Sequence, residues 1–280
     1  MLHALRSTIL APFALIATVS LAQAEAADAE ASAALFAALG LPDMIDIMRE
    51  EGLVYGDEIA TDLLSTTTNA KWKKTVSDIY DLDRMRGGAA AALTSALNGK
   101  DVDAMLAFFT SDLGREVIEL ETSARRALLD DAVDDAAKQV AGDALAEDTP
   151  RSRMVTEFVE TNDLIDTNVV GAMNANFAFY MGLQDGGAFD AELTEDQILT
   201  DVNDQEPQIR QNTTEWVYGF LMLAYQPLSD QELQAYIDFS KTEAGQDLNV
   251  AMFDAFDQMF VTISRELGRA SAQYMAGQDI

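Results

Sequence analysis

One segment occurs twice in this chain, and it constrains the fold more than any other feature. Residues 97–117 and residues 228–248 match at a constant offset of 131. Each copy holds a polar helix start, an apolar helix face, a phenylalanine, a hydroxyl residue, an acid and a glycine two residues further on. The hydroxyl of Ser111 or Thr242 can cap a second helix, and the acid suits the positive end of the helix dipole. The pattern predicts two helix–turn–helix corners, in which the glycine allows close backbone approach.

Helix-start signals extend this prediction to the rest of the chain. Capping boxes, in which a hydroxyl and a side chain three residues on satisfy free N–H groups, occur at two places and in weaker form at a third: Ser229 with Glu232, Thr194 with Gln197, and Asn98 with Asp101. There are only five prolines in 280 residues, and no alternating strand pattern is found. The sequence therefore predicts an all-α fold, a duplicated helical bundle built from helix–turn–helix repeats.

Three stretches are apolar on all sides and belong at the centre of such a bundle: residues 177–183, 216–225 and 251–263. Their aromatic and methionine side chains could line a ligand groove, but plain core packing is the favoured interpretation. Gly87 and Gly88, followed by four alanines, predict a close contact between helices.

The later copy of the repeat resembles a known family. Its sequence, LSDQELQAYIDFSKTEAGQDL, is similar to the signature of a bacterial exported family called domain of unknown function 2059, roughly L-S-x-x-E-L, a spacer and F-x-x-S/T-x-x-G-x-x-L. The earlier copy, LNGKDVDAMLAFFTSDLGREV, is a more degenerate match, with Asn98 in place of the serine and Asp101 in place of the glutamate. The resemblance implies an all-helical fold and a periplasmic setting. It implies no activity, because the family has no established one.

Residues 1–24 are typical of a secretory signal peptide. Arg6 precedes an apolar run over residues 8–21, and Ala22-Gln23-Ala24 supplies the small-x-small pattern for cleavage after Ala24. The alternative is an N-terminal membrane anchor, but the run is short for a bilayer, which needs ~20 apolar residues, and Pro12 interrupts it. We therefore expect a periplasmic protein with no stable membrane insertion after cleavage.

The composition excludes several classes of function. His3 is the only histidine and lies in the signal, so the mature chain has neither histidine nor cysteine. This excludes disulfides, thiol nucleophiles, Cys/His zinc sites and Ser-His-Asp triads. The mature chain carries 17 basic and 48 acidic side chains, a net charge of −31, which argues against nucleic acid or an anionic membrane surface as a partner.

Four aspartates between residues 130 and 135 form like-charged pairs on a predicted helix, and a bound cation could neutralise them. Arg126 lies four residues before Asp130, however, and Lys138 lies four residues after Asp134. An ordinary solvated, partly paired face is therefore the favoured interpretation.

The segment from Asp185 to Asp196 is a stronger candidate for a cation site. Five acids crowd a glycine-containing loop there: Asp185, Asp190, Glu192, Glu195 and Asp196. Calcium takes six to eight oxygen ligands from such loops, but the EF-hand order of ligands is missing. Calcium binding is kept as an alternative, and no metal ligand is assigned.

No catalytic constellation is found either. Glycoside cleavage by a carboxylate pair needs two acids about 5–10 Å apart, and the acids are too numerous for the sequence to single out a pair. S-x-x-K, G-x-S-x-G, Walker and dinucleotide motifs are absent. We therefore predict no catalytic, cofactor-binding or metal-binding residues and no cofactor.

The predicted function is that of a non-enzymatic binding or scaffolding protein of the cell envelope, whose partner is an unidentified envelope protein or ligand. The alternatives are a carboxylate-based hydrolase acting on cell-wall glycan or peptide, and a calcium-dependent binding module. The polar, acidic stretch that ends at Pro150 divides the mature chain into two predicted helical repeat units, residues 25–149 and 150–280.

Overall fold

The computed structural model describes residues 29–62, 70–189 and 194–277, and within these ranges the chain forms helices and no strands. A first helix, Ala29–Ala38, is followed by α2 (Leu41–Asp62), α3 (Ala70–Ile79), α4 (Leu82–Ala96), α5 (Val102–Phe109), α6 (Asp112–Ala127), α7 (Asp131–Ala146), α8 (Pro150–Thr161), α9 (Leu164–Asp185), α10 (Glu195–Asp204), α11 (Glu206–Ala224), α12 (Asp230–Ser240) and α13 (Glu243–Met275). The all-α prediction is confirmed. The predicted signal peptide lies outside the described residues.

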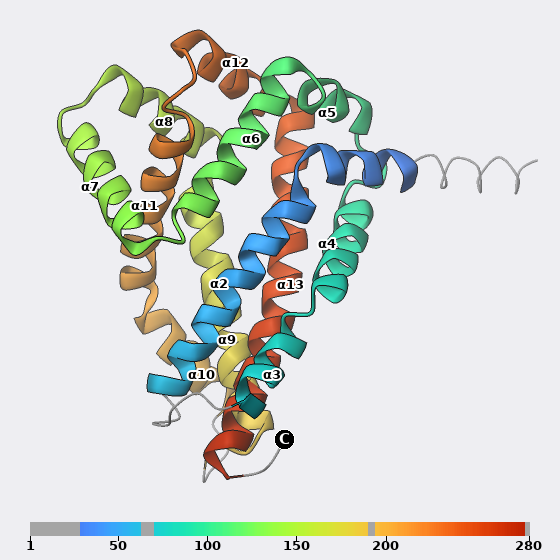
Figure 1. The fold of residues 1–280 in the computed structure, drawn as a ribbon, viewed down its shortest axis with the longest axis vertical. Coiled ribbons are helices and arrows are strands. Elements are labelled where there is room, and N and C mark those ends of the chain that lie inside the picture. The colour runs from blue at the N-terminus through green and yellow to red at the C-terminus, as the bar shows by residue number, and fades with distance from the viewer. Residues whose placement is uncertain (1–28, 63–69, 190–193, 278–280) are drawn as a thin grey trace, which may run out of the picture.

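The helices form an elongated bundle, with α5, α6 and α12 near one end and α3 and α10 near the other (Figure 1). The long helices α9 and α13 run side by side in the same direction and make the most extensive helix contact in the described structure. Their approach depends on two glycines. A Cβ added at Gly182 would lie 2.1 Å from the carbonyl oxygen of Arg265, and one added at Gly268 would lie 2.1 Å from that of Phe179. Any larger residue would push the two helices apart.

The core consists of two hydrophobic clusters that α13 joins. The larger draws on both predicted repeat units, with Leu93 and Val117 from the first and Ile237 and Leu248 from the second. The smaller cluster is centred on Trp72 and is completed by the later part of α13. The boundary at residues 149/150 falls in a tight corner, where the Thr149 side chain caps α8 and Pro150 occupies its first turn. Because the larger cluster contains residues from both sides of this boundary, the two predicted units share a core.

Both predicted helix corners are present, each with its cap. In the α5–α6 corner, the Ser111 hydroxyl accepts a hydrogen bond from the backbone N–H of Gly114 at 3.0 Å. In the α12–α13 corner, the Thr242 hydroxyl accepts one from Gly245 at 3.1 Å. The capping boxes at Ser229 and Thr194 are confirmed as well.

The corner glycines meet the preceding helix at its last carbonyls. A Cβ at Gly114 would lie 2.1 Å from the carbonyl oxygen of Phe108, and one at Gly245 would lie 2.3 Å from that of Phe239. The rings of these two phenylalanines stack on one another, with centroids 4.0 Å apart and planes 11° apart. The two corners therefore have the same kind of cap and the same kind of glycine contact, and they pack directly against each other. Duplication of the whole halves stays a prediction.

Two details of the sequence prediction are wrong. The cap of α5 is Asp101, whose carboxylate accepts from the N–H of Ala104, and not Asn98. Gly87 and Gly88 make no close helix contact, because a Cβ at either position would meet nothing within 4 Å. Two close contacts between helix backbones lie instead at Gly182 in α9 and Gly268 in α13, which no sequence pattern marks.

Within the described residues, no single helix has both the length and the apolar composition to cross a membrane. The first helix and residues 41–61 of α2, which are bent by 60° relative to each other, meet these two criteria only when taken together.

Candidate functional site

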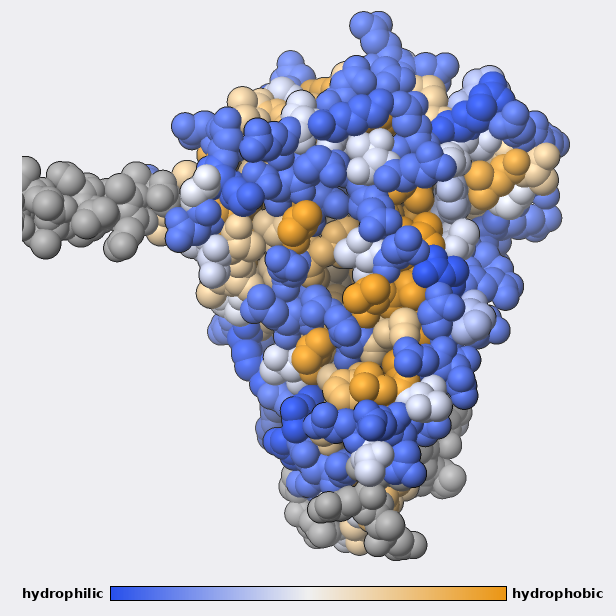
Figure 2. All heavy atoms as spheres, turned by 180° about the vertical axis from the view of Figure 1, so that it is seen from behind, coloured by the Kyte–Doolittle hydropathy of each residue, from blue (hydrophilic) through white to orange (hydrophobic). Residues whose placement is uncertain are grey.

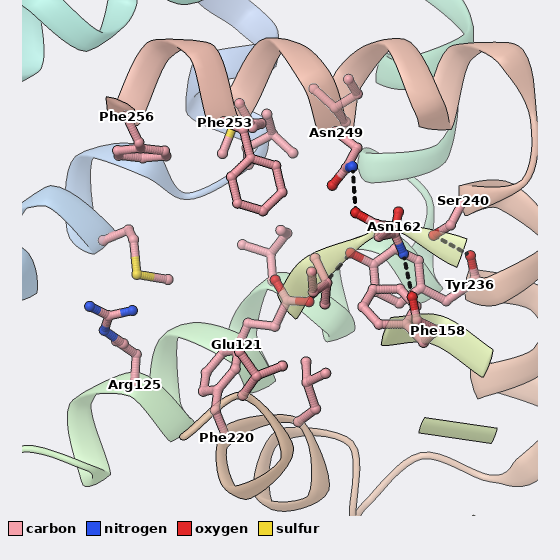
Figure 3. A pocket seen from close by; sticks show the side chains of 18 of the residues that line it. Glu121, Arg125, Phe158, Asn162, Phe220, Tyr236, Ser240, Asn249, Phe253 and Phe256 are labelled. Carbon is pink, nitrogen blue, oxygen red and sulfur yellow. Dashed lines mark hydrogen bonds between the residues drawn. The ribbon is translucent and has the colours of Figure 1, made fainter. Parts of the chain in front are cut away.

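A pocket of about 310 Å³ lies against the larger cluster and is lined mainly by α2, α6, α8, α11, α12 and α13 (Figure 3). Most of its wall is apolar, and aromatic rings from α8, α11 and α13 contribute to it: Phe158, Trp216, Phe220, Phe253 and Phe256. Among these apolar side chains stands one carboxyl group, that of Glu121 on α6. The site is therefore a hydrophobic pocket with an acidic group in its wall.

Glu121 enters the pocket because it occupies an apolar position of α6. Val117 and Ala124 of the same helix are buried, and Glu121 lies four residues after the first and three before the second. These spacings place the three side chains on one helix face. An acid interrupts the stripe that α6 turns toward the core, and this interruption is the signal by which the sequence could have identified the residue.

Two tyrosines hold the carboxyl group of Glu121. The hydroxyl of Tyr225, at the end of α11, donates to Oε1 at 2.6 Å, and the hydroxyl of Tyr236, on α12, donates to the same oxygen at 3.3 Å. They reach Glu121 from 104 and 115 residues away in the sequence. The other oxygen, Oε2, receives no hydrogen bond from the part of the chain that the structure describes, and it remains available to a ligand.

Burial dominates the electrostatics of this group. Glu121 is partly exposed as a residue, yet desolvation raises the pKa of its carboxyl from 4.5 to about 7, against the smaller lowering effect of the Tyr225 and Tyr236 hydrogen bonds. Burial, and next the negative charge of Glu121, also raises the pKa of both tyrosines well above its usual value. The tyrosines therefore stay protonated and donate hydrogen bonds, while Glu121 is divided between its two forms near neutral pH.

The nearest cation on α6 does not neutralise Glu121. Arg125 lies one turn further on and forms a two-point ion pair with Glu51 of α2, from Nε to Oε1 at 2.7 Å and from Nη2 to Oε2 at 2.6 Å. The same guanidinium lies 4.7 Å from the ring centroid of Trp216, a cation–π arrangement. Arg125 is thus fully engaged, and the carboxylate form of Glu121 has no positive partner in the pocket.

An aromatic cluster fixes the tyrosines in place. Phe158 of α8 packs against Tyr236 at a centroid distance of 4.9 Å and against Tyr225 at 5.5 Å. The two tyrosine rings meet edge to face at 5.9 Å, an arrangement that aromatic pairs favour. The hydroxyl groups therefore converge on Glu121 from rings with little freedom to turn away.

The amide groups at the other side of the pocket bond to the backbone. Asn249 of α13 donates to the carbonyl oxygen of Asn162 at 2.9 Å, and Asn162 donates to that of Phe158 at 2.9 Å. The Ser240 hydroxyl donates to the carbonyl of Tyr236 at 3.0 Å (Figure 3). The Asn249 bond ties α13 to the end of α8, whereas the other two bonds lie within α8 and α12.

The loop considered for calcium is occupied by other interactions where it is described. Asp185 accepts from Arg265 and from Arg269, each at 2.9 Å, and these hydrogen bonds lower the pKa of its carboxyl. Glu195 and Asp196 lie in the first turn of α10, whereas Asp190 and Glu192 lie outside the described residues. Within the described ranges, no group of three or more His, Cys, Asp or Glu side chains is arranged to hold a metal ion.

The aspartates of residues 130–135 form a solvated surface, with one change from the predicted pairing. Lys138 pairs with Asp134 at 2.5 Å, as its spacing predicts. Arg126 instead lies 3.5 Å from Glu50, because the helix is interrupted and Asp130 caps α7 by accepting from the N–H of Ala132 at 2.9 Å.

The pocket also changes the interpretation of two apolar stretches. Residues 216–225 and 251–263 pack in the core as predicted, but both also contribute side chains to the pocket wall. Core packing alone therefore does not account for them. Glu121 is the only carboxylate among the described residues that line the pocket, so the pair of acids that glycoside cleavage needs is not assembled here.

The comparison with protein families agrees with the resemblance that the sequence shows. Residues 83–143 match the family model described as "Uncharacterized protein conserved in bacteria (DUF2059)". The matched segment runs from the start of α4 into α7, and it contains the earlier copy of the repeat and Glu121. The match thus falls on the copy with the more degenerate signature, and a second tandem copy stays a prediction. No curated protein and no solved structure matches the chain.

Proposed function

We propose that the chain is an exported, non-enzymatic binding protein of the bacterial envelope, which holds a small, largely apolar molecule in the pocket around Glu121. One observation carries the proposal: a preformed apolar pocket of about 310 Å³ with a single carboxyl group fixed in its wall by two tyrosines. Small-molecule sites have this composition, mostly apolar with a few well-placed polar groups, and volumes of about 300–1,000 Å³.

The surface around the bundle is compatible with a bound molecule that enters from solvent. Figure 2 shows the face opposite to that of Figure 1, where hydrophobic residues gather around a hollowed central band between hydrophilic margins. The half-buried pocket residues Trp216, Phe220 and Phe253 keep part of their surface exposed. Such a surface allows an apolar ligand to reach the pocket without unfolding the bundle.

Calorimetric titration of the mature chain with eight-carbon probes tests the proposal. The probes are octylamine, 1-octanol and octanoate, which share one chain length and differ in their head group. Met252→Trp places a large side chain in the pocket wall, and Val250→Trp places the same side chain at a position of α13 that is 59% exposed. We expect at least one probe to bind the wild type and the Val250 variant, and none to bind the Met252 variant. If no probe binds, or if both variants bind equally, the proposal is wrong.

Export rests on the sequence of the first 24 residues and has its own test. After expression of the full chain in a Gram-negative host, we expect the periplasmic fraction to contain a protein that begins at Glu25. Ala24→Leu replaces the small residue that cleavage requires, and it should leave an unprocessed chain at the membrane. An unprocessed wild-type protein in the cytoplasm would contradict this part of the proposal.

A further inference from the structure

The carboxyl group of Glu121 in the pocket wall has no positively charged partner among the described residues. Arg125 is ion-paired with Glu51, and both tyrosine hydroxyls donate hydrogen bonds to Oε1 of Glu121. Within the described structure, Oε2 of Glu121 therefore has neither a hydrogen-bond donor nor a cation. A desolvated carboxylate without a positively charged partner is costly, and a ligand that supplies both a donor to Oε2 and a positive charge lowers that cost.

The walls of the pocket suit the same kind of head group. In Figure 3, Phe220 lies beside Glu121, and Phe253 and Phe256 extend into the pocket from α13. Aromatic faces attract cations, most strongly where water is excluded. The protein already uses this interaction once, where Arg125 lies over Trp216.

The net negative charge of the whole molecule also favours a cationic ligand. The mature chain carries a net −31, and a field of this sign concentrates cations and repels anions. An anionic head group would place a second negative charge beside Glu121 and would bind only after one of the two acids took up a proton. A neutral head group would leave the carboxylate desolvated and uncompensated. Only a cationic head group satisfies Oε2, the aromatic walls and the overall field together.

We propose that the pocket binds an amphipathic amine, whose ammonium group donates to Oε2 of Glu121 and whose apolar body packs against the aromatic walls. This inference rests on the proposed function, since it specifies the ligand of the same pocket.

The remaining titratable groups that line the pocket do not compete for the ammonium group. They are Arg125 of α6, which is paired with Glu51, and Tyr225 and Tyr236, which stay protonated. The described lining residues from α2, α8, α9 and α13 carry apolar or amide side chains or are glycine. Because the amine needs the carboxylate form of Glu121, whose pKa is about 7, its affinity should rise between pH 6 and pH 8 and then level off.

Matched probes test the charge preference. At pH 8 we expect octylamine to bind the wild-type mature chain at least about tenfold more tightly than 1-octanol, with octanoate the weakest. In Glu121→Gln, which keeps the size of the side chain, the affinity for octylamine should fall to that for 1-octanol, whose own binding should change little. Glu119→Gln removes the same charge from an exposed position of α6, and we expect it to keep the preference for the amine.

The possible outcomes separate the two proposals. Binding of none of the three probes overturns the proposed function and this inference together. Binding of 1-octanol or octanoate as tightly as octylamine overturns the inference alone, as does an unchanged preference in Glu121→Gln. Should Glu121→Gln fail to fold, as judged by circular dichroism, Glu121→Met provides the second variant, because a methionine, Met252, lies at the same offset of 131, just beyond the later copy. It should bind 1-octanol and show no preference for the amine.

Discussion

The α5–α6 and α12–α13 corners are alike where they build the turn and unlike where they line the pocket. Both use a hydroxyl cap and a glycine that touches the preceding helix. At the offset of 131, however, Glu121 corresponds to Met252, and Tyr236 corresponds to Met105. The polar group and one of its two hydrogen-bond donors thus stand where the other copy has methionine. The shared residues fix the corners, and the differing residues give the pocket its chemistry.

The place where the corners meet explains why these differences matter. Phe108 and Phe239 stack face to face at the contact between the corners, and the pocket lies directly beside it, since Phe239 also lines its wall. Glu121 and Met252 both face the same space. A change in one copy therefore makes that space asymmetric, with one polar side and one apolar side.

The largest expected effect concerns the feature that both corners share. In Gly114→Ala and in Gly245→Ala, the new Cβ would meet a backbone carbonyl oxygen that cannot turn aside, at 2.1 and 2.3 Å respectively. We expect each variant to lose about 3 kcal/mol or more of the free energy of unfolding, measured by urea denaturation.

Gly87→Ala is the matched control, because a Cβ there meets nothing within 4 Å and alanine is the better helix former by ~1 kcal/mol. It should leave the protein as stable as the wild type or more so. If one corner tolerated alanine and the other did not, the two corners would not be equivalent in packing.

The next largest expected effect is the dependence of stability on pH that arises from Glu121. Below pH ~4.5, Glu121 is protonated in both the folded and the unfolded chain. As the pH rises toward 7, the unfolded chain releases this proton while the folded protein keeps it, so the contribution of Glu121 to the free energy of unfolding falls by about 1.4 kcal/mol per pH unit. Above pH 7 the loss levels off at about 3 kcal/mol.

Glu121→Gln removes this dependence. The variant should match the wild type near pH 4 and exceed it by about 3 kcal/mol at pH 8, because its amide oxygen still accepts from the tyrosines and its NH₂ group faces the open side of the pocket. Urea denaturation of both proteins at intervals of one pH unit measures the difference. A constant difference across this range would show that Glu121 is ionised normally.

A smaller effect separates the two tyrosines. Tyr225→Phe removes the shorter hydrogen bond, 2.6 Å, from a side chain that is 1% exposed, whereas Tyr236→Phe removes the longer one, 3.3 Å, from a side chain that is 9% exposed. We expect losses of about 2 and about 1 kcal/mol at pH 8. Both variants should raise the pKa of Glu121, which the pH dependence of their stability measures. Equal losses, or the reverse order, would contradict this ranking.

The smallest expected effect concerns the hydroxyl caps, which both corners have. Ser111→Ala and Thr242→Ala each remove one helix cap, which typically costs ~1 kcal/mol. Thermal unfolding should show nearly equal losses in the two variants. A loss in one variant only would mean that the two caps, despite their similar hydrogen bonds, differ in importance.

Local rules allowed much of the fold to be predicted. A cap such as Thr242 and its corner glycine lie within a few residues of each other, so their interaction depends on chain geometry that the sequence carries directly. The sequence favours Asn98 wrongly as a cap, because two residues with cap-forming side chains lie three apart and the choice of Asp101 depends on where the preceding helix ends. The close contacts of Gly182 with the carbonyl of Arg265 and of Gly268 with that of Phe179 depend on how two distant helices pack, and nothing near either glycine in the sequence records them.

The sequence does not reveal the pocket around Glu121, because the contacts that define it also join distant residues. Glu121 is one of 48 acids, and it is distinguished only by its place in an apolar stripe of α6. Its hydrogen-bond donors come from α11 and α12, and neither tyrosine has a sequence neighbour that marks it as a partner for an acid. A catalytic carboxylate pair would be expected among clustered acids of the sequence, whereas the fold isolates a single carboxylate among aromatic rings.

The position of α13 in the chain has a consequence for how the protein is made. This helix of 33 residues, about 50 Å long, supplies Leu248 and Ala255 to the larger cluster and Met259 and Leu267 to the smaller. All the other described helices are synthesised before it, so the larger cluster lacks buried side chains until Ala255 has been added, and the smaller cluster until Ala270 has been added. In the export that we propose, the chain would thereby stay loosely folded while α13 is still being added, which is the state that a translocation channel accepts.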